Sequence, residues 1–194
     1  MALFKVNTGL REKEVCRLKW DYEVKVPELD TSVFIIPGEQ IKNGEERLVV
    51  LNGIAKSVVE SVRGLHSANV FVRAHKKNGE PRPVTKMNNT AWKAARERAA
   101  DAWTKERGES APAGFRNIRV HDLKHTFGRR LRAAGVSFED RQDLLGHRSG
   151  RITTHYSQAE LTSLIEASEK VCDTESRNHL ASAQNRLATE ALSY

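Results

Sequence analysis

The stretch HDLKHTFGRRLRAAGVSFEDRQDLLGH, residues 121–147, predicts two consecutive helices. The first ends at Gly135, because glycine closes a helix in the left-handed conformation without strain. Ser137 then caps the second helix, with an acidic residue three positions on in a capping-box-like arrangement, and Gly146 ends it. The apolar positions in between face inward at helical spacing. This stretch therefore predicts a helical second half for the chain.

Three short β-like runs precede it, at residues 22–26, 33–36 and 47–51. The last two are separated by PGEQIKNGEE, in which Asn43-Gly44 is a strong hairpin-turn signal. Further helices are predicted at residues 10–20 with Thr8 as N-cap, from Asn52-Gly53 to about residue 63, and at 88–107 and 159–171. The fold class is therefore α+β and mostly α, with a small antiparallel sheet near the N-terminus.

Composition limits the function classes. The chain has 194 residues, a net charge of +7 and a pI near 9.6, which favours an anionic partner such as nucleic acid or a membrane surface. Its apolar runs are too short to span a bilayer, and no signal peptide is evident. Two distant cysteines without a CxxC motif exclude a zinc ribbon or a disulfide framework. We therefore expect no membrane association and a cytoplasmic setting.

Three stretches carry chemistry: TGLREKEVCRLKW (8–20), HDLKHTF (121–127) and LLGHRSGRITTHY (144–156). In this order, with a basic hairpin between the first two, they resemble the catalytic domain of the tyrosine recombinase (phage integrase) family. The resemblance implies a site-specific DNA recombinase. A tyrosine attacks a DNA phosphodiester, displaces a 5′-hydroxyl and leaves a 3′-phosphotyrosyl intermediate. It also implies that the reaction needs no metal and no cofactor.

The resemblance assigns Tyr156 as the nucleophile and Arg11 as the first phosphate-binding arginine. A guanidinium fork suits two phosphate oxygens, although an isolated Arg at a helix start is more often an exposed residue. Lys42 matches the hairpin lysine that protonates the leaving oxygen, and on chemistry alone it is equally an ordinary turn lysine. Glu14 matches a supporting acidic position that orients the site, or is a surface partner of a nearby arginine.

Two histidines complete the matched set. His121 would contact the phosphate or accept the tyrosine proton, since a phenol with a pKa of ~10 is barely ionised at neutral pH. The alternative for His121 is a helix-start packing or capping role. His147 would donate to a phosphate oxygen, or is a plain surface residue after a helix-ending glycine.

The sequence departs from the family at Lys124, where the motif has a second arginine. Lysine keeps the charge but loses the bidentate fork. Because the loss of one transition-state donor typically costs ~10²–10³ in rate, we expect reduced or specialised activity. The alternative function is a catalytically impaired DNA-binding module of the same fold.

A zinc-dependent hydrolase built on His121 and His125 is a weaker alternative. The two histidines are four positions apart, but the general-base glutamate of HExxH is missing. A third ligand would have to come from His147 or His155. The resemblance therefore takes precedence, and no metal site is predicted.

Basic residues outside the motifs are candidates for contacts with the DNA backbone, which give affinity without sequence information. Those assigned to DNA binding are Lys76, Lys77, Arg82, Lys86, Arg119 and Arg129. The resemblance implies double-stranded DNA as the partner, with self-association into a synaptic tetramer on it. The resemblance also implies a bacterial or phage-encoded protein associated with the nucleoid.

The domain organisation follows from where the motifs lie. Residues 1–158 are predicted to form the catalytic domain, with the family's N-terminal core-binding domain absent, so a fragment of a longer protein is expected. Residues 159–194 form a helical tail, which carries three basic and six acidic residues together with Ser157–Gln158. Its apolar stripe docks either on its own domain or on a neighbouring subunit.

Overall fold

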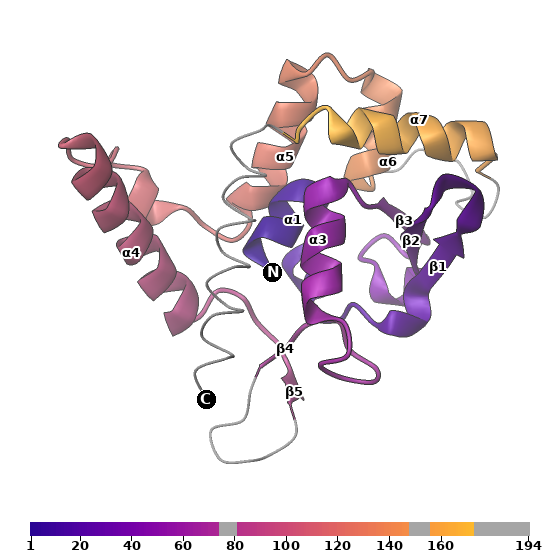
Figure 1. Cartoon of the computed structure of the whole chain (residues 1–194), viewed down its shortest axis with the longest axis horizontal. Helices are drawn as coiled ribbons and strands as arrows, with labels where there is room; N and C mark the ends of the chain where they lie inside the picture. The colour runs from indigo at the N-terminus through magenta and orange to yellow at the C-terminus, as the bar shows by residue number, and fades with distance from the viewer. Residues whose placement is uncertain (74–80, 148–155, 173–194) are drawn as a thin grey trace.

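The computed structural model describes residues 1–73, 81–147 and 156–172. In Figure 1 a small sheet lies on the right side of the molecule, with helices beside and above it. The helices are α1 Ala2–Thr8, α2 Glu12–Cys16, α3 Gly53–Val62, α4 Thr90–Arg107, α5 Asp122–Ala133, α6 Phe138–Leu145 and α7 Gln158–Glu169. The strands are β1 Glu23–Val26, β2 Thr31–Ile36, β3 Arg47–Val50, β4 Val72–Arg73 and β5 Arg82–Pro83. The mostly helical α+β class is confirmed.

The sheet is an antiparallel meander in the order β1-β2-β3. Phe34 of β2 lies opposite both Glu23 of β1 and Val49 of β3. The turn between β2 and β3 contains Gly44 at φ +75°, a left-handed conformation that suits glycine. Strands β4 and β5 form a separate two-stranded ribbon. The predicted sheet near the N-terminus is therefore confirmed.

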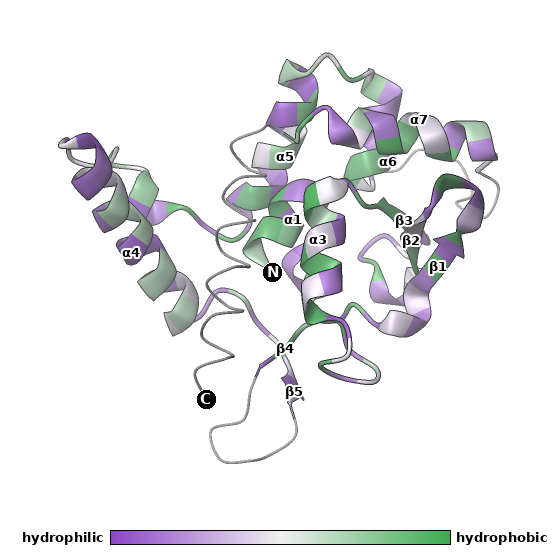
Figure 2. Ribbon diagram, in the orientation of Figure 1, coloured by the Kyte–Doolittle hydropathy of each residue, from purple (hydrophilic) through white to green (hydrophobic). Residues whose placement is uncertain are grey.

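Two apolar clusters form the core. The first joins α1, α2 and α3 to the sheet through side chains such as Phe4, Phe34 and Val59. The second joins the sheet to α5, α6 and α7, and includes Phe127 and Leu164. Apolar colour accordingly runs through α1 and α3, whereas α4 is mostly polar or weakly apolar (Figure 2).

Helix α4 projects from the rest of the molecule (Figure 1). Its N-terminal end is held where the Trp92 indole Nε1 and the Arg96 guanidinium both donate to the Ile118 carbonyl, at 3.1 and 2.9 Å. Farther along, the Trp103 and Phe115 rings stack with centroids 5.7 Å apart. These contacts attach the helix mainly to the segment that follows it in sequence.

The helix predicted over residues 10–20 differs from the structure at both ends, since α2 covers only Glu12–Cys16. Thr8 is the last residue of α1, not the N-cap of the next helix, and its hydroxyl donates to the Phe4 carbonyl behind it. Gly9 then closes α1 at φ +63°, and Arg11 is the N-cap of α2. Gly9 therefore separates α1 from α2 at the point where the apolar pattern predicts the start of one helix.

The described part of the tail packs on its own chain. Helix α7 contacts β3 and α6, and Leu164, Ala167 and Ser168 are buried there. The side chain of Asn52 donates to the Ser168 carbonyl at 3.2 Å, which ties α7 to the start of α3. Residues 148–155 and those after Cys172 fall outside the described residues.

Candidate active site

Arg11 and Glu14 are held together by the start of α2. The Arg11 backbone N–H donates to Glu14 Oε2 at 2.7 Å, and Arg11 Nη1 donates to Oε1 at 2.9 Å. Gly9 lets the backbone before α2 pack closely against Phe127, since a Cβ at position 9 would lie 2.8 Å from the Phe127 ring. Glu14 is buried, so a surface ion pair does not describe it. The arginine is partly exposed beside an enclosed carboxylate.

Arg47 is a site residue that the sequence analysis missed. It opens strand β3, and only 2% of its side chain is exposed. Its Nη1 donates to Glu14 Oε2 at 2.6 Å, and its Nη2 donates to the carbonyls of Thr8 and Leu144. Burial lowers the pKa of the guanidinium to about 10 despite the opposing effect of Glu14. The only sequence signal is an arginine at the edge of an apolar run.

Lys5 was also missed. It is fully buried in α1, and its ammonium donates to the Leu10 carbonyl, immediately before Arg11. Burial lowers the pKa of Lys5 to about 8, while the Glu14 carboxylate works in the opposite direction. A buried lysine inside an apolar helix start is therefore part of the charge cluster beneath the site.

One pocket brings together three of the predicted catalytic side chains. Arg11, Lys42 and His121 line it, along with Glu14 and Glu39. Its volume of about 570 Å³ lies within the range of ligand sites in proteins. Lys42 is exposed in the turn before β3, and His121 is exposed at the start of α5. Residues from three distant parts of the chain therefore meet at one opening.

His121 favours its neutral form. Burial is the main cause that lowers its pKa, and the positive charges of His125 and Lys5 add to the effect. The rings of His121 and His125 meet edge to face with centroids 4.7 Å apart. Within residues 1–73, 81–147 and 156–172, no group of three His, Cys, Asp or Glu is arranged to hold a metal ion; His155 is outside those ranges.

Lys124 is nearly enclosed, with 6% of the residue exposed. Its Nζ donates to the Leu145 carbonyl at 2.6 Å. Burial lowers its pKa to about 7, and the charges of Arg47 and Arg11 lower it further. The lysine lines a groove between α5 and α6 together with His147. It therefore sits beside the predicted site while its ammonium holds the end of α6.

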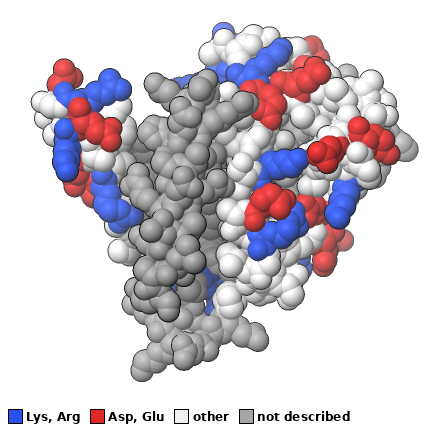
Figure 3. All heavy atoms as spheres, in the orientation of Figure 1, with Lys and Arg blue, Asp and Glu red and all other residues white. Residues whose placement is uncertain are grey.

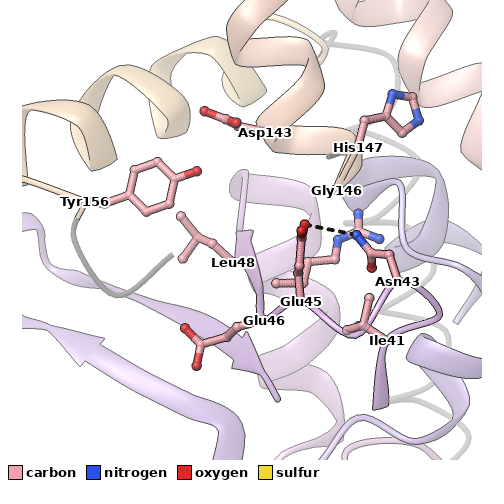
Figure 4. Close-up of a pocket in the computed structure, with 10 residues that line it drawn as sticks. Ile41, Asn43, Glu45, Glu46, Leu48, Asp143, Gly146, His147 and Tyr156 are labelled. Atoms are coloured by element: carbon pink, nitrogen blue, oxygen red, sulfur yellow. Dashed lines mark hydrogen bonds between the residues drawn. The ribbon is translucent and has the colours of Figure 1, made fainter. Parts of the chain in front are cut away.

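His147 connects this groove to a smaller pocket that contains Tyr156. Figure 4 shows Tyr156 and Asp143 on one side of the small pocket, with His147 across from them and Glu45 and Glu46 below. Burial lowers the pKa of His147, and the charges of Lys124, Arg11 and Arg47 act in the same direction. His147 of the third motif thus lies beside Lys124 of the second, whereas Tyr156 lines the small pocket and not the one formed by Arg11, Lys42 and His121.

The predicted DNA contacts are spread over several elements. Arg82 and Lys86 are exposed on and after β5, while Lys76 and Lys77 lie outside the described residues. Arg119 is exposed but paired with Asp122 at 2.9 Å. The face drawn in Figure 3 shows acidic and basic side chains interspersed, without a patch of one sign.

Arg129 lies in a different setting. It lines the α5–α6 groove with Arg132, Arg141 and the exposed Phe138, next to Lys124 and His147. The Arg141 guanidinium lies 5.8 Å from the centre of the Phe138 ring. Among the described residues, those that line this groove include Lys124, Arg129, Arg132 and Arg141 but no Asp or Glu.

The sequence of the chain matches the model of the phage integrase family over residues 1–162. The chain belongs to the phage integrase family. The match covers all three motifs and includes Arg11, Lys42, His121, His147 and Tyr156. The resemblance read from those motifs is confirmed.

Two curated relatives are similar over most of the chain. The integrase of Salmonella phage P22 is 30% identical over 175 residues, which are 87% of this chain and 41% of the relative. Tyrosine recombinase XerC of Pelobacter propionicus is 27% identical over 177 residues, 84% of this chain and 53% of the relative. The chain therefore spans about half the length of these relatives.

Among solved structures, the integrase of transposon Tn1549 in complex with a circular intermediate DNA is similar at 18% identity and a TM-score of 0.48. The match covers 85% of this chain and 56% of that one. A second structure of the same integrase, also with circular intermediate DNA, matches with a TM-score of 0.47.

Among the described residues, no helix is both long and apolar enough to cross a bilayer.

Proposed function

We propose that this chain is the catalytic part of a site-specific DNA recombinase, which cleaves and rejoins DNA through a 3′-phosphotyrosyl intermediate. The observation that carries the proposal is the meeting of Arg11, Lys42 and His121 at one pocket, beside Lys124 and His147. These are cationic or hydrogen-bonding groups from separate parts of the chain, and the charge of Arg11 is balanced by an adjacent buried carboxylate. Such a site suits a phosphodiester that gains negative charge as it reacts.

In the proposed reaction the Tyr156 oxygen attacks the phosphorus, and the bond to the 5′-oxygen breaks. Lys42 supplies a proton to that leaving oxygen, so a 5′-hydroxyl is released. Arg11 and His147 donate to the non-bridging oxygens in the transition state. A 5′-hydroxyl from another strand reverses the step. Neither a metal nor a nucleotide cofactor takes part in this scheme.

The lowered pKa of His121 supports a role as proton acceptor. A neutral imidazole has a free ring nitrogen that can take the tyrosine proton, whereas the protonated form cannot. Burial and neighbouring charged groups lower the pKa of His121 and so favour the neutral form that this task needs. Glu14 acts on Arg11, whose guanidinium it contacts, rather than on substrate.

Double-stranded DNA is the proposed partner, and the exposed Arg82, Lys86, Arg119 and Arg129 are proposed to contact its backbone together with Lys76 and Lys77. We place residues 1–158 in the catalytic domain. Residues 159–194 form the helical tail in this proposal, and the protein is proposed to assemble into a tetramer on DNA. A nucleoid-associated, cytoplasmic location follows from the same proposal.

The nucleophile is tested with nicked duplexes whose sequence is randomised around the nick, so that the pool itself supplies the target site. The unmodified protein is expected to retain a subset of duplexes covalently after denaturing washes. The variant Tyr156→Phe should retain none, because it lacks the attacking oxygen. Equal covalent retention by both proteins would show that Tyr156 is not the nucleophile.

A second candidate function is a DNA-binding module that has lost most activity. Lys124 favours it, because this lysine replaces the family's arginine and its ammonium is bonded to the Leu145 carbonyl. Lys124→Arg separates the two functions. If the rest of the site is intact, the restored fork should raise the rate of adduct formation about tenfold or more. DNA binding without adducts in both proteins would favour the binding module.

A further inference from the structure

Arg47 is enclosed in the charge cluster, where it contacts both halves of the proposed site. With 2% of its side chain exposed, it lies beneath the pockets rather than at their openings. A buried cation needs partners that repay its lost hydration, and removal of such a partner is costly. The identity of those partners indicates what Arg47 does.

The first partner leads to Arg11. Glu14 Oε2 accepts from Arg47 Nη1 at 2.6 Å and from the Arg11 backbone N–H at 2.7 Å, while Oε1 accepts from Arg11 Nη1 at 2.9 Å. Arg47 thereby fixes the carboxylate that orients Arg11. The Arg11 side chain is 31% exposed at the pocket. It is held on its buried side by Glu14, which Arg47 holds in turn.

The second set of partners leads to His147. Arg47 Nη2 donates to the Leu144 carbonyl at 3.3 Å, in the last turn of α6, whose carbonyls have no partner within the helix. The next carbonyl, that of Leu145, accepts from Lys124. Two cations from different elements therefore stabilise the negative end of this helix.

Gly146 shows how closely Arg47 packs against the approach to His147. Gly146 has φ +59°, and a Cβ at this position would lie 2.6 Å from the Arg47 Nε. The guanidinium thus lies directly against the residue before His147. Its contacts reach from the turn at Thr8, through Glu14, to the end of α6.

We infer that Arg47 is a positioning residue that sets Arg11, through Glu14, and His147, through the end of α6, in one fixed relation. The inference rests on the proposed recombinase function. A lysine at position 47 keeps the charge, but a single ammonium on a flexible stem cannot reproduce a planar fork that reaches Glu14 and Leu144 together. Arg11 and His147 would then be positioned independently of each other.

The variant Arg47→Lys tests this inference. With a duplex selected from the nicked pool, the single-turnover rate of adduct formation is expected to fall about 10²-fold, as a displacement of about 1 Å can cause. DNA affinity should change little, and the variant should still unfold in one cooperative transition, although at a lower melting temperature because buried groups lose partners. The matched control is Arg63→Lys, because Arg63 is ion-paired with Glu23 and Glu60 outside the site; its rate should stay within twofold of the unmodified protein.

A second variant separates positioning from structural support. Glu14→Gln should also slow cleavage, and the double variant should be slower than Arg47→Lys alone by no more than about twofold, because Arg47 acts on Arg11 through Glu14 and its route to His147 is already lost. Independent, multiplying losses would overturn the inference. So would a rate for Arg47→Lys within twofold of the unmodified protein, or a loss that only follows a loss of folding.

Failure of the proposed function is recognised separately. If the unmodified protein binds DNA but forms no adduct, the recombinase proposal is wrong, and the positioning of His147 is then judged by NMR. The His147 imidazole resonances should shift in Arg47→Lys and stay unchanged in Arg63→Lys. Unchanged resonances in both variants would overturn the inference as well.

Discussion

At the residue scale, the site is a set of exposed groups that rests on buried charges. Arg11 and His121 face the pocket, whereas Lys5, Arg47 and Lys124 lie beneath it. The buried cations lower one another's pKa values, and Glu14 opposes them. The net result is a cluster of buried positive charges beneath the exposed groups of the proposed site, which suits a phosphodiester that gains negative charge as it reacts.

The lowered pKa of Lys124 predicts a pH-dependent stability. In the unfolded chain this lysine keeps its proton up to its ordinary pKa of 10.5, whereas in the folded chain it loses the proton near 7. Between these values the unfolded state holds more protons, so the free energy of unfolding rises with pH. Each such group contributes at most about 1.4 kcal/mol per pH unit.

Denaturant melts between pH 7.5 and 9.5 check this prediction. Lys124→Met should show a smaller rise than the unmodified protein; part of the rise should persist because the pKa of Lys5 is also lowered. Lys93→Met, which removes an exposed lysine of α4, should leave the rise unchanged. Identical slopes for Lys124→Met and the unmodified protein would contradict the burial argument.

The sequence could predict the exposed members of the site but not the buried ones. Arg11, Lys42, His121, His147 and Tyr156 stand in motifs that can be recognised locally. Arg47 has no such signal, because its burial arises only when α2, β3 and α6 converge from distant parts of the chain. The role of Lys5 could not be predicted for the same reason, since its partner carbonyl lies beyond the end of its own helix.

At the scale of elements, the helices with strong caps were predictable. Asn52, Asn89 and Ser137 each accept a backbone N–H at a helix start, and Gly146 closes α6 in the left-handed conformation. The start of the chain was not predictable in the same way. There, Gly9 separates two short helices that share one apolar pattern.

Helix α7 is expected to contribute directly to the stability of its own chain. Leu164 is 3% exposed and packs in the second core cluster with Val33 and Leu48. Leu164→Ala should lower the free energy of unfolding by about 2–5 kcal/mol, the range for a buried leucine. Leu65→Ala, at a position 53% exposed, should change it by less than about 0.5 kcal/mol.

Denaturant melts at two protein concentrations measure both variants. A loss for Leu164→Ala that is the same at both concentrations fits packing within one chain. A negligible loss, or one that appears only at the higher concentration, would show that α7 is stabilised by a neighbouring molecule instead.

At the scale of the whole molecule, the net charge of +7 is carried by a chain whose acidic and basic groups are interspersed over the face seen in Figure 3. The α5–α6 groove differs, because its charged lining residues are all basic. Among the described parts of the chain, this groove is therefore where we propose that the positive charge meets DNA. The net charge of the sequence alone could not have located this groove.

DNA binding should depend steeply on salt, because each phosphate neutralised by the protein releases counterions. Arg129→Gln is expected to weaken binding about equally for all sequences and to reduce the slope of log K against log salt by about 1. Arg63→Gln, which removes an arginine paired with Glu23 and Glu60, should leave the slope unchanged. Fluorescence anisotropy across a salt series measures both, and equal slopes for all three proteins would place Arg129 outside the interface.

The most direct measurement of the central claim is the identity of the residue that becomes attached to DNA. Covalent complexes from the nicked pool are digested with protease and nuclease, and the remaining nucleotide-bearing peptide is sequenced by mass spectrometry. The proposed mechanism predicts one modified peptide, with the nucleotide joined through its 3′-phosphate to Tyr156. Attachment at another residue, or through a 5′-phosphate, would contradict it.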